Sequence, residues 1–75
     1  MRKGTRERIR QEILNGLDFG PVEVKVDRIA HGLCVTIPEQ TTGDGKKLPP
    51  ITVRHKDPAR LVRNTHKEIL EALQG

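Results

Sequence analysis

Residues 57–73 read DPARLVRNTHKEILEAL, and this stretch decides the fold because it describes an amphipathic helix. Asp57 followed by Pro58 is typical of a helix start, since aspartate caps the first turn and proline is favoured at the first helical position. Positions three or four residues apart predict one buried face: Leu61, Val62, Thr65, Ile69, Ala72 and Leu73. Gly75 stands where a C-terminal cap would lie. The stretch therefore predicts a helix that covers a core with one face.

Upstream of this helix, three short stretches alternate apolar and polar residues, the pattern of half-buried strands. They are residues 22–26 (VEVKV), 33–37 (LCVTI) and 51–54 (ITVR). The connection over residues 28–32 is short, which favours a hairpin between the first two strands. Because the alternation is clean, one face of the sheet should pack on the core and the other should be solvated.

A second helix is predicted over residues 5–15, with Thr5 as its cap and Gly16 ending it in the left-handed conformation. Its apolar stripe comprises Ile9, Ile13, Leu14 and Leu17. Arg6 and Arg10 project along the same side as this stripe. Their stems either lie along the edge of the core or line a binding surface beside the sheet.

These elements predict an α+β fold in the order helix–three-stranded antiparallel sheet–helix, with both helices packed on one sheet face. The 75 residues suit a single domain spanning residues 1–75. Residues 1–4 are expected to be flexible. Residues 38–49 (PEQTTGDGKKLP) are expected to form a mobile loop, because they combine glycines and lysines with a proline at each end.

The composition favours a polyanionic partner. The formal net charge is +4, and 32% of the residues are charged. A single cysteine excludes an internal disulfide framework. No apolar run approaches the roughly 20 residues of a membrane span, and the basic start lacks the apolar stretch of a signal peptide. We therefore expect a cytoplasmic protein with no membrane partner.

The strongest constellation is basic. Arg60, Arg63 and Lys67 share one side of the C-terminal helix at i, i+3 and i+7, and Arg54 and Lys56 come just before it. Such groups contact phosphates and give salt-dependent, sequence-independent affinity; a solvated helix face is the alternative. Further basic residues that could extend such a phosphate-contacting surface are Arg2, Lys3, Arg6, Arg8, Arg10, Lys46 and Lys47.

Aromatic side chains are nearly absent, since Phe19 is the only one. Readers of single strands stack bases on aromatic rings, which this chain lacks. Recognition of a duplex by shape and phosphate needs no aromatics. The composition therefore favours duplex or structured RNA over single strands.

His31 lies in the connection between the first two strands, beside Gly32, where it can act as an acid or base near neutral pH. An ordinary turn histidine is the alternative. Cys34 is expected to be a structural thiol. The histidines and Cys34 lack metal-ligand spacing, and residues 42–47 lack the spacing of a phosphate-binding loop. No metal or other cofactor is predicted.

The order of elements resembles the double-stranded-RNA-binding domain fold. In that fold the loop between the first two strands often carries a histidine, and the second helix starts with a lysine cluster. Ala30-His31-Gly32 and the set Lys56, Arg60, Arg63 and Lys67 stand in comparable places. The resemblance implies binding of duplex RNA.

The chain is also similar to the HicA-type toxins, small ribonucleases of the same fold. The stretch ITVRH, residues 51–55, and the helix ending KEILEAL, residues 67–73, look like their third strand and last helix. This similarity implies a metal-independent ribonuclease in which His31 is the catalytic residue.

We therefore predict a small basic module that binds nucleic acid, more readily duplex or structured RNA than single strands, through phosphate contacts. One alternative is the HicA-like ribonuclease. Another is a small regulator or inhibitor that docks on the acidic surface of a protein partner.

Overall fold

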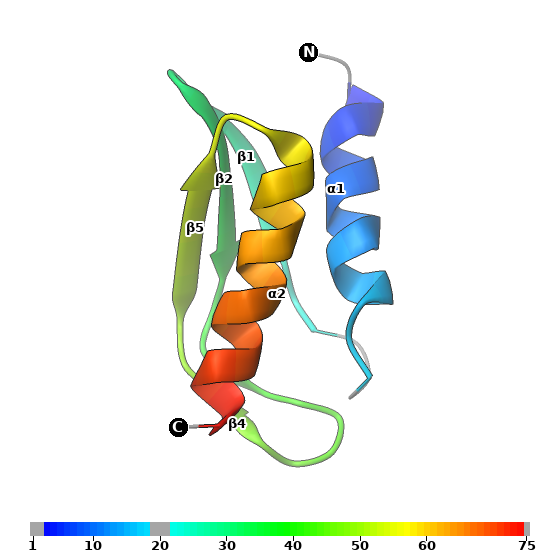
Figure 1. Ribbon diagram of the computed structural model, residues 1–75. Helices are drawn as coiled ribbons and strands as arrows, with labels where there is room; N and C mark the ends of the chain where they lie inside the picture. Colours follow the sequence, from blue (N-terminus) through cyan, green and yellow to red (C-terminus); the bar gives the residue numbers. More distant parts are fainter. Residues whose placement is uncertain (1–2, 19–21, 75) are drawn as a thin grey trace.

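The computed structural model describes residues 3–18 and 22–74, so the predictions for Arg2, Phe19 and Gly75 lie outside the described residues. The elements follow the order α1 (Lys3–Asn15), β1 (Lys25–Ile29), β2 (Gly32–Ile37), β3 (Gln40–Thr41), β4 (Lys47–Leu48), β5 (Ile51–His55) and α2 (Pro58–Gln74). The strands β1, β2 and β5 form one sheet, and both helices lie side by side on one of its faces (Figure 1). The predicted α+β class and layering are confirmed.

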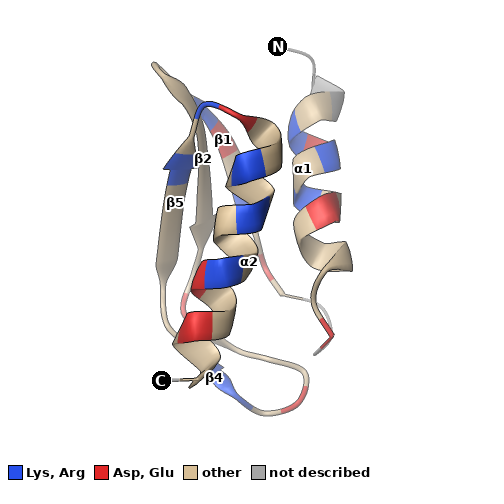
Figure 2. Cartoon of the chain, in the orientation of Figure 1, with Lys and Arg blue, Asp and Glu red and all other residues tan. Residues whose placement is uncertain are grey.

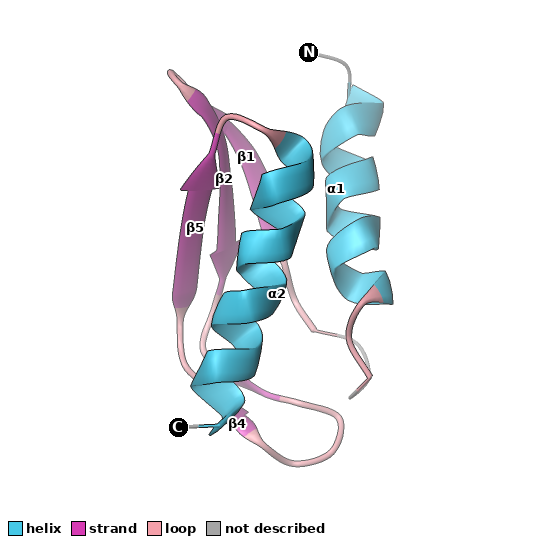
Figure 3. Ribbon diagram, viewed as in Figure 1, coloured by secondary structure: helices cyan, strands magenta, loops and turns pink. Residues whose placement is uncertain are grey.

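The central strand of the sheet is β2, which pairs antiparallel with both neighbours. Val35 lies opposite Val26 on β1 and opposite Val53 on β5. Side chains of this register face the helices and form the core. The fully buried members are Ile9, Ile13, Leu33, Val35, Ile37, Leu48, Leu61, Thr65 and Ile69. The core is therefore aliphatic and lies between the sheet and the two helices (Figure 3).

The first strand starts later than the alternation predicts. Val22 and Val24 are buried as expected, but the paired strand begins only at Lys25. The reason is that side chains, rather than a neighbouring strand, form hydrogen bonds with the backbone of the residues before Lys25. The Gln40 amide accepts a hydrogen bond from Glu23 N–H (2.8 Å) and donates one to the Glu23 carbonyl (3.1 Å). Arg10 Nε donates to the Val24 carbonyl at 3.2 Å, so this segment needs no neighbouring strand.

The segment predicted as a loop, residues 38–49, contains a second, two-stranded ladder. Here β3 pairs antiparallel with β4, and Leu48 is buried in the core. Thr42 closes the turn between the two strands through two hydrogen bonds with Lys46. The Thr42 hydroxyl accepts from Lys46 N–H (3.0 Å), and the main-chain N–H of Thr42 donates to the Lys46 carbonyl (2.8 Å). The mobility of this segment stays a prediction.

The helix α1 differs from the prediction in where it begins and in the conformation of the glycine that follows it. It begins at Lys3, so Thr5 lies inside the helix rather than at its cap. It ends at Asn15 as predicted, but the φ angle of Gly16 is not positive. Packing, rather than backbone conformation, explains why a glycine stands at position 16, because a Cβ there would collide with the His66 ring on α2.

The helix α2 begins as its sequence predicts. Asp57 Oδ1 accepts a hydrogen bond from Ala59 N–H at 3.1 Å, which caps the first turn. Leu61, Thr65 and Ile69 are buried on the face toward the sheet. Within the described residues, no helix is both long enough and apolar enough to cross a membrane.

Candidate nucleic-acid interface

Both helices begin at the same end of the molecule, and this end carries most of their basic side chains. Figure 1 shows α1 and α2 running in the same direction, and Figure 2 shows Lys and Arg gathered on the N-terminal half of each helix. The basic residues of α1 and of the first half of α2 therefore lie toward one end of the molecule. Two helix N-termini there add positive partial charge from the aligned peptide dipoles.

The outer side of α2 forms a basic ridge, which we define as Arg60, Arg63 and Lys67. All three residues are exposed. Arg60 Nε lies 3.8 Å from Asp57 Oδ2, and this contact is exposed enough to be weak. Arg63 and Lys67 form no ion pair within the described part of the chain. No acidic residue stands within the first turn of α2, but the Asp57 carboxylate caps this turn and offsets part of the positive charge at the helix end.

A polar groove separates α2 from the free edge of β5. It is lined by Thr52, Val53, Arg54, Asn64, Lys67 and Glu68. Arg54 and Lys67 lie on its two sides, and the Glu68 carboxylate weakens the positive charge at this point. The groove therefore connects the basic ridge on α2 with the basic residues of β5.

A second hollow lies at the corner between the β1–β2 turn and the end of β5, and we call it the corner hollow. Its lining residues are Ile29, His31, Arg54, His55 and Lys56. Arg54 belongs to both the corner hollow and the polar groove, so basic side chains continue around the β5 edge.

Gly32 makes the corner possible. Its φ is +143°, and a Cβ there would lie 2.7 Å from the His55 carbonyl oxygen and 3.0 Å from Lys56 Cα. Only glycine allows this backbone approach without a shift. The approach holds the two-residue turn Ala30–His31 against the connection between β5 and α2.

His55 has a defined hydrogen-bonding role in this corner. Its Nδ1 accepts a hydrogen bond from Asp57 N–H at 2.9 Å. A ring nitrogen that accepts carries no proton, so the proton of the neutral ring lies on Nε2. Nε2–H is therefore available as a donor. His55 was not predicted from the sequence as a site residue. In the structure, its place opposite Leu33 in the β2–β5 register brings it near the turn that carries His31.

Other predicted site residues lie elsewhere. Arg10 Nε donates a hydrogen bond to the Val24 carbonyl at 3.2 Å, and its Nη1 forms an ion pair with Glu7 at 3.2 Å. Arg6 is exposed on the first turns of α1. The lysines Lys46 and Lys47 lie at the opposite end of the molecule from the corner hollow (Figure 1).

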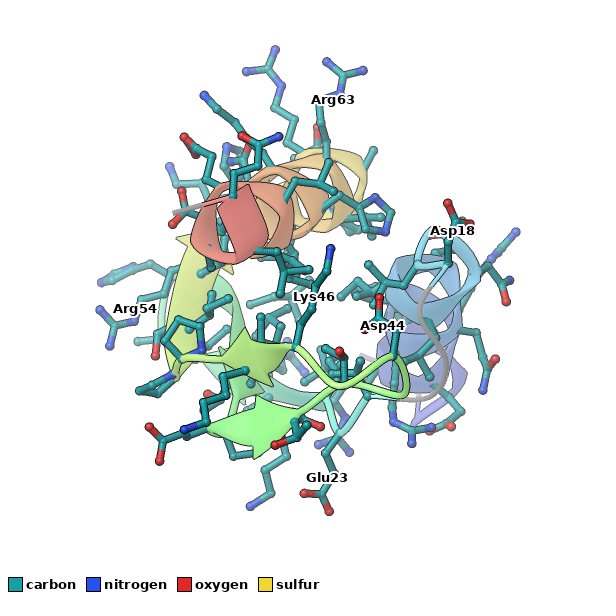
Figure 4. The ribbon with its side chains drawn as sticks, turned by 90° about the horizontal axis from the view of Figure 1, so that it is seen from below. Asp18, Glu23, Asp44, Lys46, Arg54 and Arg63 are labelled. Carbon is teal, nitrogen blue, oxygen red and sulfur yellow. The ribbon has the colours of Figure 1, made fainter. Side chains whose placement is uncertain are left out.

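The basic side chains do not converge on one pocket. Figure 4 shows Arg54 pointing outward from β5 and Arg63 pointing outward from α2 in a different direction, while Lys46 extends toward α2 from the turn below. An extended polyanion that lies across the surface can contact such groups, whereas a small anion cannot contact them together.

The remaining candidate groups are structural or dispersed. Cys34 is a buried free thiol whose Sγ lies 3.9 Å from Thr36 Oγ1. Within the described residues, no three His, Cys, Asp or Glu side chains gather as a metal site. Thr42 donates a hydrogen bond to the Asp44 carboxylate, and this bond, with the nearby Lys46 charge, holds the pKa of Asp44 below its ordinary value.

The chain was compared with models of protein families, with curated protein sequences and with solved structures, and none of the three comparisons gave a match.

Proposed function

We propose that this protein binds nucleic acid, and duplex or structured RNA in preference to single strands, through phosphate contacts. The observation that supports this most is the common direction of α1 and α2, which puts two helix N-termini and the basic ridge at one end. The net charge of +4 supplies long-range attraction for a polyanion. The scarcity of aromatic rings disfavours readout by base stacking.

The proposed contacts come from three groups of side chains. The basic ridge on α2 would contact one stretch of phosphates, and Arg54 and Lys56 would contact a neighbouring stretch around the β5 edge. Arg6 and Arg8 are exposed on α1 and would extend the contact. Arg10 is left out, because its guanidinium already binds the Val24 carbonyl and Glu7.

The test is a titration of labelled duplex RNA, duplex DNA and single strands at low and physiological salt. We expect tightest binding to duplex RNA, with affinity that falls steeply as salt rises. Arg63→Ala and Lys67→Ala should each weaken binding uniformly across sequences and lower the salt slope by about one unit. Unchanged slopes in both variants would contradict the proposal. Weak, unselective binding that vanishes at physiological salt would point to the protein-partner alternative.

Cleavage of RNA at His31 is a second candidate, favoured by the corner hollow that His31 shares with His55. In this reaction His31 takes the proton of a ribose 2′-hydroxyl, and the 2′-oxygen attacks the adjacent phosphorus. The bond from phosphorus to the 5′-oxygen breaks, and that oxygen receives the proton. A 2′,3′-cyclic phosphate and a 5′-hydroxyl should accumulate with the purified protein and not with His31→Ala. Intact RNA after long incubation would exclude this candidate.

The cytoplasm is the proposed location. RNA partners are found there, and the free thiol of Cys34 suits a reducing compartment.

A further inference from the structure

The outer side of β5 is an open edge of the sheet. The strand order is β1-β2-β5, so β5 has a neighbour on one side only, and no other described strand pairs with it (Figure 1). An unpaired edge presents main-chain donors and acceptors that can pair with another strand. We propose that this edge pairs with the same edge of a second copy of the chain, which gives a symmetric dimer. The inference goes beyond the proposed function and does not depend on it.

The main-chain groups at this edge belong to Thr52 and Arg54. The two-residue turn between β1 and β2 is closed by the pair Ile29–Gly32, and the closing pair of such a hairpin exchanges both of its hydrogen bonds. Hydrogen bonding alternates along β2, so the Val35–Val53 pair exchanges its bonds on the β5 side. The N–H and C=O groups on either side of Val53, those of Thr52 and Arg54, therefore point away from the sheet.

A two-fold axis through Val53 gives these groups matching partners. Thr52 of each copy then lies opposite Arg54 of the other, and each pair exchanges two hydrogen bonds, so the two pairs give four. An axis through Arg54 would place two arginines directly opposite each other, which is unfavourable. An axis through Thr52 would place Arg54 opposite Pro50, which has no N–H. The sequence of β5 therefore favours the axis through Val53.

The polar groove shows where this axis passes α2. The groove brings Asn64 and Glu68 of α2 to the level of Thr52, Val53 and Arg54. Figure 1 shows α2 running alongside β5. A two-fold axis perpendicular to the sheet therefore lays two copies of α2 side by side in opposite directions. The Asn64 amide of one copy then faces the Glu68 carboxylate of the other, and it can donate a hydrogen bond to it.

The charges of α2 are complementary in this arrangement. Arg60, Asn64, Lys67 and Glu71 are spaced by three or four residues and so share one side of the helix. Figure 2 shows Lys and Arg on the first half of α2 and acidic residues on its second half. Two antiparallel copies place each basic half beside the acidic half of the other, with Arg60 facing Glu71 of the second copy. Complementary charge of this kind sets the orientation in which two surfaces meet.

The other edge of the sheet is less suited to pairing. The edge strand β1 carries Lys25, Asp27 and Arg28 among its five residues. Charged side chains along an edge strand oppose pairing with another chain. Arg54 is the only Lys, Arg, Asp or Glu of β5. The difference between the two edges favours a dimer over an open chain of copies, because pairing through β5 alone closes after two copies.

The dimer is compatible with the proposed binding of nucleic acid. Figure 4 shows Arg63 directed away from β5, so its guanidinium stays accessible when two β5 edges meet. Because the two copies of α2 run in opposite directions, the helix N-termini of the two copies lie at opposite ends of the dimer. Each copy therefore keeps its own basic end.

The test is sedimentation equilibrium of the full chain without nucleic acid, over a range of concentrations up to about 1 mM. We expect the average mass to rise from that of a monomer toward that of a dimer as the concentration increases, since small interfaces associate weakly. A chain that stays monomeric throughout this range would overturn the inference. Loss of RNA binding alone would leave it standing, because the experiment contains no RNA.

Two substitutions at Thr52 separate the edge from the fold. Thr52→Pro removes an N–H that points outward, and edge strands accept proline at such positions. We expect its dimer to be at least about tenfold weaker, since one donor is lost from each copy. Circular dichroism should show the monomer still folded. Thr52→Val keeps both main-chain groups and should dimerise as the original chain does. Equal association of the two variants would assign the dimer to another surface.

A charge exchange tests whether the two copies of α2 meet. Arg60 and Glu71 lie about 16 Å apart along one helix, too far to pair within a chain. Arg60→Glu and Glu71→Arg should each weaken the dimer about tenfold, and the double variant should restore it. The new charges suit the helix dipole, so α2 should stay helical. Arg63→Ala is the control and should leave the dimer unchanged. A double variant as weak as the single ones would contradict the inferred dimer.

Discussion

The Nε2 atom of His66 on α2 lies 2.9 Å from the main-chain carbonyl oxygen of Ile13 on α1, and since a carbonyl only accepts, the ring donates this bond. The same oxygen accepts from Gly16 N–H at 3.2 Å. The carbonyls of the last helical turn lack the usual i+4 donor, and this one accepts two hydrogen bonds instead, one from Gly16 N–H and one from the His66 ring. The ring also lies against Gly16, where a Cβ would collide with it. One side chain thus fixes where the end of α1 contacts α2.

Gly16→Ala and His66→Ala should therefore show non-additive effects on stability. The added methyl group collides with the ring, so Gly16→Ala should lower the free energy of unfolding by about 1–3 kcal/mol. His66→Ala removes one hydrogen bond and should cost about 1 kcal/mol. In the double variant the ring is gone and the methyl group has space, so the total loss should be smaller than the sum. Urea denaturation of the three variants measures this, and strict additivity would contradict the contact.

Gly32→Ala should be more destabilising than Gly45→Ala, although both glycines have positive φ. At Gly45 (φ +89°) a Cβ would meet no atom within 4 Å, so the cost is conformational, about 1–2 kcal/mol. At Gly32 (φ +143°) a Cβ would also lie 2.7 Å from the His55 carbonyl oxygen. The additional collision should raise the cost to about 3 kcal/mol. Thermal denaturation compares the two directly, and equal losses would mean that the corner is not held by this close approach.

Gln40 is expected to hold the segment before β1. Gln40→Ala removes an acceptor for Glu23 N–H and donors for the carbonyls of Glu23 and Pro38. These bonds are exposed, so the free energy of unfolding should fall by only about 1 kcal/mol. Hydrogen exchange at the Glu23 amide should accelerate more than at paired amides of β1. Gln40→Glu should behave similarly, because a carboxylate cannot donate to the two carbonyls. The exposed Gln11→Ala on α1 is the control.

The same contacts explain which part of the fold could be predicted from the sequence. Alternating valines correctly predicted that Val22 and Val24 are buried. They could not predict that the backbone between them pairs with a side chain from β3 rather than with a strand. Periodicity shows which face is buried, whereas the hydrogen-bond partner depends on segments distant in the sequence. The short ladder of β3 and β4 was missed for this reason, since each strand has two residues.

The candidate site, too, could be predicted only in part from the sequence. The helical spacing alone predicts that Arg60, Arg63 and Lys67 share a side. The placement of Lys46 at the far end could not be predicted, because it depends on where the chain returns between β2 and β5. The proximity of His55 to the turn of His31 depends on the β2–β5 register, which pairs Leu33 with His55. Register is set by the packed sheet as a whole.

The turn of residues 42–46 should loosen in acid. The Thr42 hydroxyl lowers the pKa of Asp44, so the carboxylate form is favoured in the folded turn. A lowered folded-state pKa adds stability at pH values above the unfolded pKa, and this contribution is lost as pH falls through the folded value. We therefore expect faster amide exchange at Lys46 below about pH 4 relative to the intrinsic rate. Asp44→Asn should abolish this pH dependence, and its persistence in that variant would assign it to another group.

Lys46 and Lys47 should contribute little to the salt dependence of duplex binding. The molecule is 36 Å long, and these lysines lie at the opposite end from the start of both helices. Charges separated by more than about 8 Å are largely screened at physiological salt, so lysines this far from the basic ridge add little to binding there. The ammonium of Lys46 also lies near the Asp44 carboxylate, whose pKa it helps to lower. Lys46→Ala and Lys47→Ala should therefore leave the slope of affinity against salt unchanged, in contrast to the loss of about one unit for Arg63→Ala. A slope lowered equally by all three variants would mean that the nucleic acid contacts the full length of the molecule, and the interface would then have to include the turn between β3 and β4.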